Sequence, residues 1–303
     1  MNFTGLENYI LIWVIITGLC LGSFYNVVIF RSLSDESIIY PPSKCPKCGN
    51  RLKPWHNIPI LSYIFLRGKC AFCKEKISIQ YPLVEFLTGL LFGGIFIKFG
   101  MSWTTLFGIF WISCLIIMTA TDLKEKVVDC NIAIAMGISG LIFSFINSGW
   151  IGAKDSLFGA LIGIIIIEAV ALIGKLFKKG RAMGEADTYV AGAFGAIAGW
   201  HDIGLILIYS LIASMLFILP AFWYERYKAK DSLTIFFSAL FVFSISLFIL
   251  FNGVYWTIIL LIIAGLLLSY TVIKSMKAED KKTCLPFVPA LSLGFLYFLM
   301  FVL

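Results

Sequence analysis

Residues 102–122 read SWTTLFGIFWISCLIIMTATD, and this stretch decides the fold class of the chain. It runs for 20 residues without a charge before Asp122, which is the length an α-helix needs to cross the hydrocarbon core of a bilayer. The whole chain has the same character, because 60% of its 303 residues are hydrophobic and only 14% are charged. This composition excludes a water-soluble globular core. The sequence therefore predicts an all-α polytopic membrane protein.

Nine further apolar segments accompany this one. They cover residues 8–30, 83–99, 130–147, 155–175, 184–200, 203–223, 233–251, 254–273 and 286–302. The segment at 184–200 is short, is rich in Gly and Ala, and carries Glu185 and Asp187. We therefore expect about 8–10 transmembrane helices.

The distribution of positive charge predicts the orientation of these helices. If the first segment runs from outside to inside and each later segment crosses once, 22 of the 24 Lys and Arg residues lie on the inner side. Only Lys98 and Lys154 lie on the outer side. By the positive-inside rule, the 22 residues face the cytosol. The net charge of +7 is thus a topological signature that can also attract anionic lipid, and it does not indicate nucleic-acid binding.

The only long polar stretch, residues 31–80, contains two C-x2-C pairs, Cys45-Pro-Lys-Cys48 and Cys70-Ala-Phe-Cys73, with 21 residues between them. Such pairs form either a tetrahedral zinc site or disulfides. The orientation places this insert in the cytosol, where thiols stay reduced, so zinc is favoured. Four thiolates leave no coordination position for water or substrate, which indicates a structural zinc ion and not a catalytic one.

Two aspartates stand at the predicted cytosolic ends of apolar segments. Asp122 ends the third segment and Asp187 opens the sixth. Each alone reads equally as an interfacial or capping residue. Two carboxylates held close together share a proton, so that one can activate water while the other protonates a carbonyl. This is aspartyl protease chemistry. A transporter with intramembrane carboxylates and a non-catalytic scaffold are the alternatives.

Several motifs occur in an order that resembles the type IV prepilin peptidases, bacterial intramembrane aspartyl proteases of the G-x-G-D class. The motifs are Gly22-Ser-Phe-Tyr-Asn-Val27, Cys45-Pro-Lys-Cys48, Asn57-Ile-Pro-Ile60, Leu66-Arg-Gly-Lys-Cys70, Tyr81-Pro-Leu-Val-Glu85, Asp122-Leu123, Gly184-Glu-Ala-Asp187 and Leu285-Pro-Phe-Val-Pro289. Ala186 stands where many members have the second glycine. The segments at 233–251 and 254–273 exceed the eight usual in the family.

The resemblance implies that Asp122 and Asp187 are catalytic, with Gly184 and Ala186 in the active-site loop. It implies cleavage of the basic leader of prepilins and pseudopilins after a glycine, at the cytosolic face of the bacterial inner membrane. It also implies N-methylation of the new N-terminus with S-adenosylmethionine, although the chain has no glycine-rich nucleotide loop. Glu85 is expected to cap a helix, contact the leader or face the headgroups, and Asp129 to be solvated or auxiliary.

The organisation that we expect has three parts. Residues 1–30 form the first transmembrane helix, residues 31–80 a cytosolic tetracysteine zinc-binding domain, and residues 81–303 the polytopic peptidase domain. The expected partners are prepilin or pseudopilin substrates and the lipid bilayer, with no nucleic acid. Glu168, within an apolar run, is expected to make a polar contact inside the helix bundle.

Overall fold

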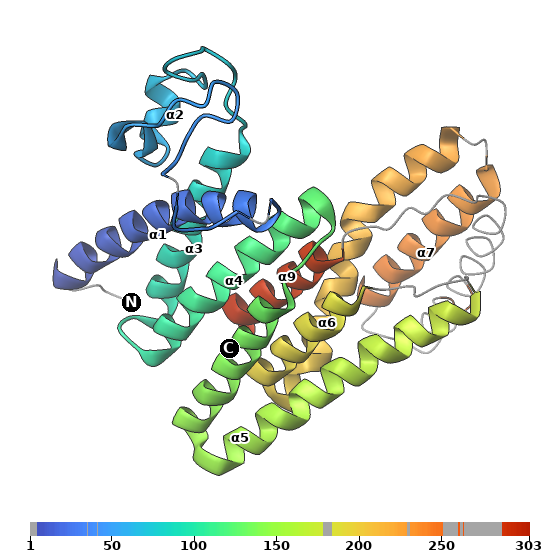
Figure 1. Cartoon of the computed structure of the whole chain (residues 1–303). Coiled ribbons are helices and arrows are strands. Elements are labelled where there is room, and N and C mark those ends of the chain that lie inside the picture. Colours follow the sequence, from blue (N-terminus) through green and yellow to red (C-terminus); the bar gives the residue numbers. More distant parts are fainter. Residues whose placement is uncertain are drawn as a thin grey trace. The chain divides into compact units, whose positions relative to one another are not determined.

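A computed structural model describes residues 5–34, 36–40, 42–177, 184–228, 231–250, 260, 263 and 287–303. These residues divide into two compact units. The first comprises Met1–Lys175, Gly180–Leu211 and Pro286–Leu303, and the second comprises Leu176–Lys179 and Ile212–Leu285. Within the described ranges the secondary structure is helical, apart from two isolated antiparallel bridges in the insert (Figure 1).

The helices follow the apolar segments of the sequence. Their bounds are α1 Gly5–Ser32, α2 Leu61–Phe65, α3 Gln80–Phe99, α4 Trp103–Glu125, α5 Cys130–Phe177, α6 Glu185–Lys228, α7 Ser232–Leu250 and α9 Val288–Tyr297, with a 3-10 turn at Pro54–Asn57 and a π-helical turn at Phe298–Val302. The segment expected at 254–273 lies outside the described residues, apart from positions 260 and 263.

Two of the long helices each contain two of the expected segments. Gly149 interrupts α5 with φ 60° and ψ −141°, and Gly199 interrupts α6 with φ 78° and ψ 175°. Glycine adopts these backbone angles without the steric cost that a Cβ imposes. Figure 1 shows α5 as two arms that meet at a bend. The segments expected at 130–147 and 155–175 left residues 148–154 between them, but Gly149 alone turns the chain.

The first unit is built around close helix pairs. Helices α1 and α3 pack along their length through small residues, since a Cβ on Gly18 would lie 2.9 Å from Cα of Gly89. Small residues thus allow the helices to approach where lipid supplies no hydrophobic driving force between them.

Helix α4 begins at an N-cap, where Ser102 Oγ accepts a hydrogen bond from the N–H of Thr105 at 3.2 Å.

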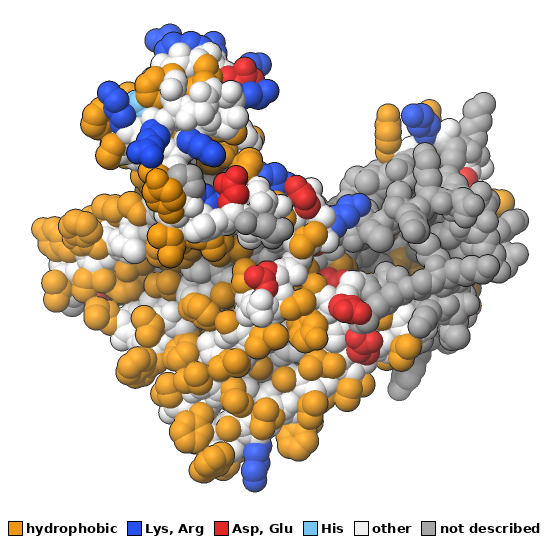
Figure 2. All heavy atoms as spheres, viewed as in Figure 1, with side chains coloured by type: hydrophobic (Ala, Val, Ile, Leu, Met, Phe, Trp, Pro, Cys, Tyr) orange, Lys and Arg blue, Asp and Glu red, His pale blue; other side chains and the backbone are white. Residues whose placement is uncertain are grey.

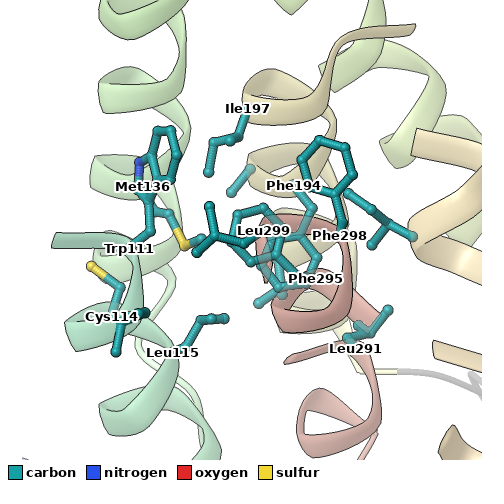
Figure 3. Packing of buried hydrophobic residues seen from close by; sticks show 14 of the residues in the cluster. Trp111, Cys114, Leu115, Met136, Phe194, Ile197, Leu291, Phe295, Phe298 and Leu299 are labelled. Carbon is teal, nitrogen blue, oxygen red and sulfur yellow. The ribbon is translucent and has the colours of Figure 1, made fainter. Parts of the chain in front are cut away.

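A hydrophobic core joins α4, α5, α6 and α9 (Figure 3). Trp111 of α4 lies edge-on to Phe143 of α5 and to Phe295 of α9, with ring centroids 5.1 and 6.3 Å apart. Phe295 also stacks on Phe194 of α6 at 4.5 Å. Phe295, in the last apolar segment of the chain, therefore packs against aromatic side chains that precede it by 100 residues or more.

Five helices, α1, α3, α4, α5 and α6, are long and apolar enough to cross a membrane. Hydrophobic side chains cover the face of the helical body below the insert, whereas most of the visible Lys and Arg side chains lie on or near the insert (Figure 2). The prediction of an all-α polytopic membrane protein with a small tetracysteine insert is confirmed.

Most of the described part of the second unit belongs to the end of α6 and to α7. Asp231 caps α7, because its carboxylate oxygens accept hydrogen bonds from the N–H and the hydroxyl of Thr234, at 3.2 and 2.7 Å. Trp223 Nε1 donates a 2.6 Å hydrogen bond to Ser238 Oγ and ties the two helices together.

Candidate active site and metal centre

The four cysteines of the insert lie together. Their sulfur atoms are all within 4.8 Å of one another, and 3.9 Å separates Sγ of Cys45 from Sγ of Cys73. Four thiolates at about 2.3 Å around a tetrahedral zinc ion would lie about 3.8 Å apart. Cys45, Cys48, Cys70 and Cys73 therefore fit a metal ion, and they form the only such cluster of His, Cys, Asp or Glu in the part of the chain that the structure describes.

Both cysteine pairs sit in the same kind of backbone turn. In the first turn, the N–H of Cys45 donates to the carbonyl of Asn50 at 3.0 Å. In the second, the N–H of Cys70 donates to the carbonyl of Glu75 at 2.8 Å. An isolated antiparallel bridge flanks each turn, so the insert presents two copies of one metal-binding knuckle.

The residue after each pair adopts a left-handed conformation and closes the knuckle. Gly49, with φ 70°, donates its N–H to the carbonyl of Cys45, and Lys74, with φ 60°, donates its N–H to the carbonyl of Cys70. Hydrogen bonds from the backbone of Cys73 and Phe72 lower the pKa of the Cys70 thiol to about 7. The backbone of the second knuckle thus favours the thiolate of Cys70, the form that binds a metal. At Cys73 a backbone hydrogen bond at Glu75 acts in the same direction, but burial and the neighbouring thiols outweigh it and raise the pKa to about 11.

Asp122 lies at the end of α4 and is buried, with 6% of its surface exposed. Its Oδ2 accepts a 3.1 Å hydrogen bond from the backbone N–H of Val288, at the start of α9. Lys126 adopts a left-handed conformation, and its N–H donates to the carbonyl of Asp122, which ends the helix. The C-terminal segment of the chain thus fixes the first aspartate.

Asp187 lies in the first turn of α6 and is also buried, with 8% of its surface exposed. Its Oδ2 accepts a 3.0 Å hydrogen bond from the N–H of Gly184, which precedes the helix. The neighbouring Thr188 donates its hydroxyl to Oε1 of Glu168 on α5, at 3.0 Å. This contact is the polar contact within the bundle that was expected for Glu168.

One hydrophobic core supports the segments that carry the two aspartates. Met118 lies one turn before Asp122 on α4, and Val190 lies nearly one turn after Asp187 on α6. Both belong to the same buried cluster as Val288, whose N–H binds Asp122. The two carboxylates therefore stand at helix ends that rest on one shared core.

Glu85 makes a contact that the sequence did not predict. It is buried in the second turn of α3, and its Oε2 accepts a 2.7 Å hydrogen bond from the backbone N–H of Ile60 in the insert. Ile60 has φ 59°, which an isoleucine rarely adopts. The carboxylate therefore ties the insert to a membrane helix.

The remaining candidates lie nearer to solvent. Asp129 is exposed, and its Oδ1 accepts a 2.8 Å hydrogen bond from the N–H of Asn131 at the start of α5, which is a capping contact. Gly184 is exposed, and Ala186 is partly buried in the first turn of α6. Gly184 reaches the candidate site through its N–H on Asp187.

Sequence reasoning missed the role of the Val288 backbone. A main-chain donor has no residue signature, but Pro289 next to it marks the first turn of a helix, where N–H groups lack partners within the helix. The signal was therefore present in the Phe287-Val-Pro289 element, which sequence analysis had matched only as part of a motif.

Comparison with known proteins assigns the family. Residues 16–99 match the bacterial peptidase A24 N-terminal domain, and residues 109–219 match the type IV leader peptidase family. No solved structure is significantly similar to the chain.

Several relatives carry the name prepilin leader peptidase/N-methyltransferase, among them the following three. The protein of Neisseria gonorrhoeae is 33% identical over 230 residues, which cover 68% of this chain and 79% of the relative. That of Pseudomonas aeruginosa is 32% identical, over 67% of this chain and 78% of the relative. That of Myxococcus xanthus is 34% identical, over 69% of this chain and 62% of the longer relative. With the motifs in order and both family domains matched, the chain belongs to the type IV leader peptidase family.

Proposed function

We propose that the protein is a membrane aspartyl endopeptidase that removes the basic leader peptide from type IV prepilins and pseudopilins after a glycine. We further propose that it N-methylates the new N-terminal amine. The family assignment and the relatives' names support both activities. The structural observation that carries the peptidase proposal is the pair of buried aspartates, Asp122 and Asp187, whose helices share one core.

The two carboxylates hold one proton between them in the resting state. The ionised aspartate takes a proton from water, and the oxygen of that water attacks the scissile carbonyl carbon. The protonated aspartate gives its proton to the carbonyl oxygen, which forms a neutral tetrahedral diol. Collapse of the diol breaks the C–N bond, the amine receives a proton from one aspartate, and the other recovers a proton from the diol hydroxyl.

The position of the aspartates suits a substrate that is itself held in the membrane. Asp122 ends a membrane helix and Asp187 begins one, so both lie near the level where a membrane-spanning substrate helix starts. The distribution of Lys and Arg supports a cytosolic location of this level, in the inner membrane of a bacterium. The basic leader on that side is then within reach of Asp122 and Asp187.

The insert holds a structural zinc ion in this proposal. Cys45, Cys48, Cys70 and Cys73 supply a closed shell of four thiolates, and the ion stabilises the fold of a segment that has few buried apolar side chains. The chain then divides into the first transmembrane helix at 1–30, a zinc-binding domain at 31–80 and the peptidase domain at 81–303.

The second activity follows the first on the same product. Cleavage releases a primary amine at the N-terminus of the mature substrate, and S-adenosylmethionine supplies the methyl group. The relatives' names are the support for this activity.

A cleavage assay tests the proposal. The purified protein in lipid nanodiscs is incubated with a full-length prepilin, with and without S-adenosylmethionine, and the products are weighed by mass spectrometry. We expect loss of the leader in both samples and a gain of one methyl group only with the methyl donor. An intact prepilin in both samples would contradict the peptidase and would favour a transporter or scaffold.

A further inference from the structure

The surface of the insert offers a continuous apolar helix face to its surroundings. Helix α2 has only five residues, and three of them, Leu61, Ile64 and Phe65, stand at positions i, i+3 and i+4. Their exposed fractions are 52%, 61% and 81%. One whole side of α2 is therefore apolar and uncovered, in a domain that is otherwise rich in Lys and Arg.

The contact with Glu85 sets the level of α2 against the membrane helices. Glu85 is five residues into α3, which corresponds to about 7.5 Å along the helix axis. It binds the N–H of Ile60, the residue that immediately precedes α2. Helix α2 therefore starts beside the first turns of a membrane helix and not out in the cytosol.

Other residues around α2 are of the kinds that proteins place at a bilayer interface. Trp55 is exposed, and the ammonium group of Lys53 lies 5.2 Å from its ring centroid. Arg67, two residues after the end of α2, is exposed, as is Lys69. Ile79, just before α3, is also exposed. Long basic side chains beside apolar ones can reach lipid headgroups while the apolar ones enter the acyl region.

The charge of the insert identifies the partner. Residues 31–80 contain nine Lys and Arg against three Asp and Glu, a net charge of +6 that becomes +4 when four cysteine thiolates hold a zinc ion. This charge repels a basic leader peptide and attracts the anionic headgroups of a membrane. Both ends of the insert join membrane helices, so such headgroups are always within its reach.

From these observations we propose that the exposed face of α2 inserts into the adjacent leaflet and anchors the zinc domain on anionic lipid. Leu61, Ile64 and Phe65 contact acyl chains, and Lys53, Arg67 and Lys69 contact headgroups. Glu85 fixes the depth from the protein side. The proposal concerns the insert alone and does not depend on the peptidase activity.

Photo-crosslinking in the full-length protein tests this contact. Benzoylphenylalanine is placed at Phe65 in nanodiscs of mixed zwitterionic and anionic phospholipid, with prepilin present. Position Leu90, exposed on the membrane helix α3, is the positive control, and position Lys47, exposed on the first knuckle, is the negative control. We expect phospholipid adducts at 65 and 90 and at least tenfold less at 47. Adducts at 65 no more abundant than at 47, or adducts to prepilin or to a second copy of the chain, would overturn the proposal.

The charged residues give a second, independent readout. Replacing Arg67 and Lys69 by Gln should lower the anionic-lipid adduct at position 65 by about fivefold for each lost charge. The adduct at position 90 should not change. Zinc content, measured on the same samples, verifies that the insert remains folded. A phospholipid adduct yield at 65 that is the same in the double variant as in the unsubstituted protein, or the same in purely zwitterionic lipid as in the anionic mixture, would overturn the anchoring on anionic lipid.

Discussion

The backbone N–H of Val288 donates a 3.1 Å hydrogen bond to Oδ2 of Asp122, across 166 residues of sequence. This contact makes the start of α9 part of the candidate active site. The Leu285-Pro-Phe-Val-Pro289 motif near the end of the chain therefore has a structural role at the site. Its backbone supplies the N–H group that binds Asp122.

The central prediction concerns the two carboxylates. Asp122→Asn and Asp187→Asn should each reduce prepilin cleavage by at least 1,000-fold, because an amide cannot exchange a proton with water or substrate. The mobility shift of the processed prepilin measures the effect. Asp155→Asn, in the second arm of α5, is the matched control and should cleave at the normal rate. Substantial cleavage by either of the first two variants would remove that aspartate from the mechanism.

The contact between Thr188 and Glu168 should stabilise the start of α6. Thr188→Val removes the hydroxyl that binds Glu168, whereas Thr188→Ser keeps it. We expect the valine variant to lose about 1–2 kcal/mol of unfolding free energy and the serine variant to lose much less. Thermal unfolding in detergent measures the difference, and equal losses in the two variants would contradict a role for the hydroxyl.

The two knuckles make opposite predictions about glycine. Lys74 carries a Cβ at a left-handed φ of 60°, so Lys74→Gly should stabilise the insert by about 1 kcal/mol. Gly49→Ala, at the equivalent position of the first knuckle, should destabilise it by about the same amount. Lys47→Gly is the control, because Lys47 is not in the left-handed region and gains nothing from glycine. The measurement is the loss of bound zinc to a competing chelator, which should be slowest in Lys74→Gly and fastest in Gly49→Ala.

Removing the metal should affect the insert more than the helices. Metal analysis should find one zinc per chain, and Cys45→Ser or Cys73→Ser should abolish that zinc, because a site with three thiolates binds far more weakly. Limited proteolysis should then cut within residues 31–80 while the membrane helices remain intact. A metal-free protein in which all four thiols resist alkylation would contradict the site.

Cysteine labelling tests the topology that the mechanism requires. In a background with Cys20 replaced by Ser, a cysteine at Asn147 should react with an impermeant reagent added outside intact cells. Cysteines at Glu125 and at Glu185 should react only after the membrane is opened. If the cysteines at positions 125 and 185 label from opposite sides of the membrane, Asp122 and Asp187 lie at opposite faces and cannot act on one substrate.

Sequence patterns predicted the helices and the cysteine cluster, which depend on side chains. They missed the hydrogen bonds in which the donor is a main-chain N–H group. Unbroken apolar runs predicted the helices, and two C-x2-C pairs predicted a cluster that the structure brings within 4.8 Å. The donors to Glu85 and Asp122 are main-chain N–H groups of Ile60 and Val288, which any residue other than proline could supply. The residue types at positions 60 and 288 therefore do not predict these hydrogen bonds.

The reversal within α5 illustrates a different limit. The segments expected at 130–147 and 155–175 leave seven residues for the connection, yet the helix resumes directly after Gly149. Periodicity and hydropathy describe the arms of a helix pair, but the length of the connection depends on whether one residue can take the required φ and ψ. Because Gly149 adopts the required backbone angles, a connection that was expected to take seven residues takes only one.

These short reversals bear on how the protein can be inhibited. The connection between α3 and α4 is only residues 100–102, and that within α5 is Gly149. Among the described residues, these two connections at the end of the first unit away from the zinc domain offer almost no loop that an antibody could recognise. In the orientation proposed above, an inhibitor would therefore reach the two aspartates from the lipid or from the cytosol, and these short turns would offer little to an impermeant agent.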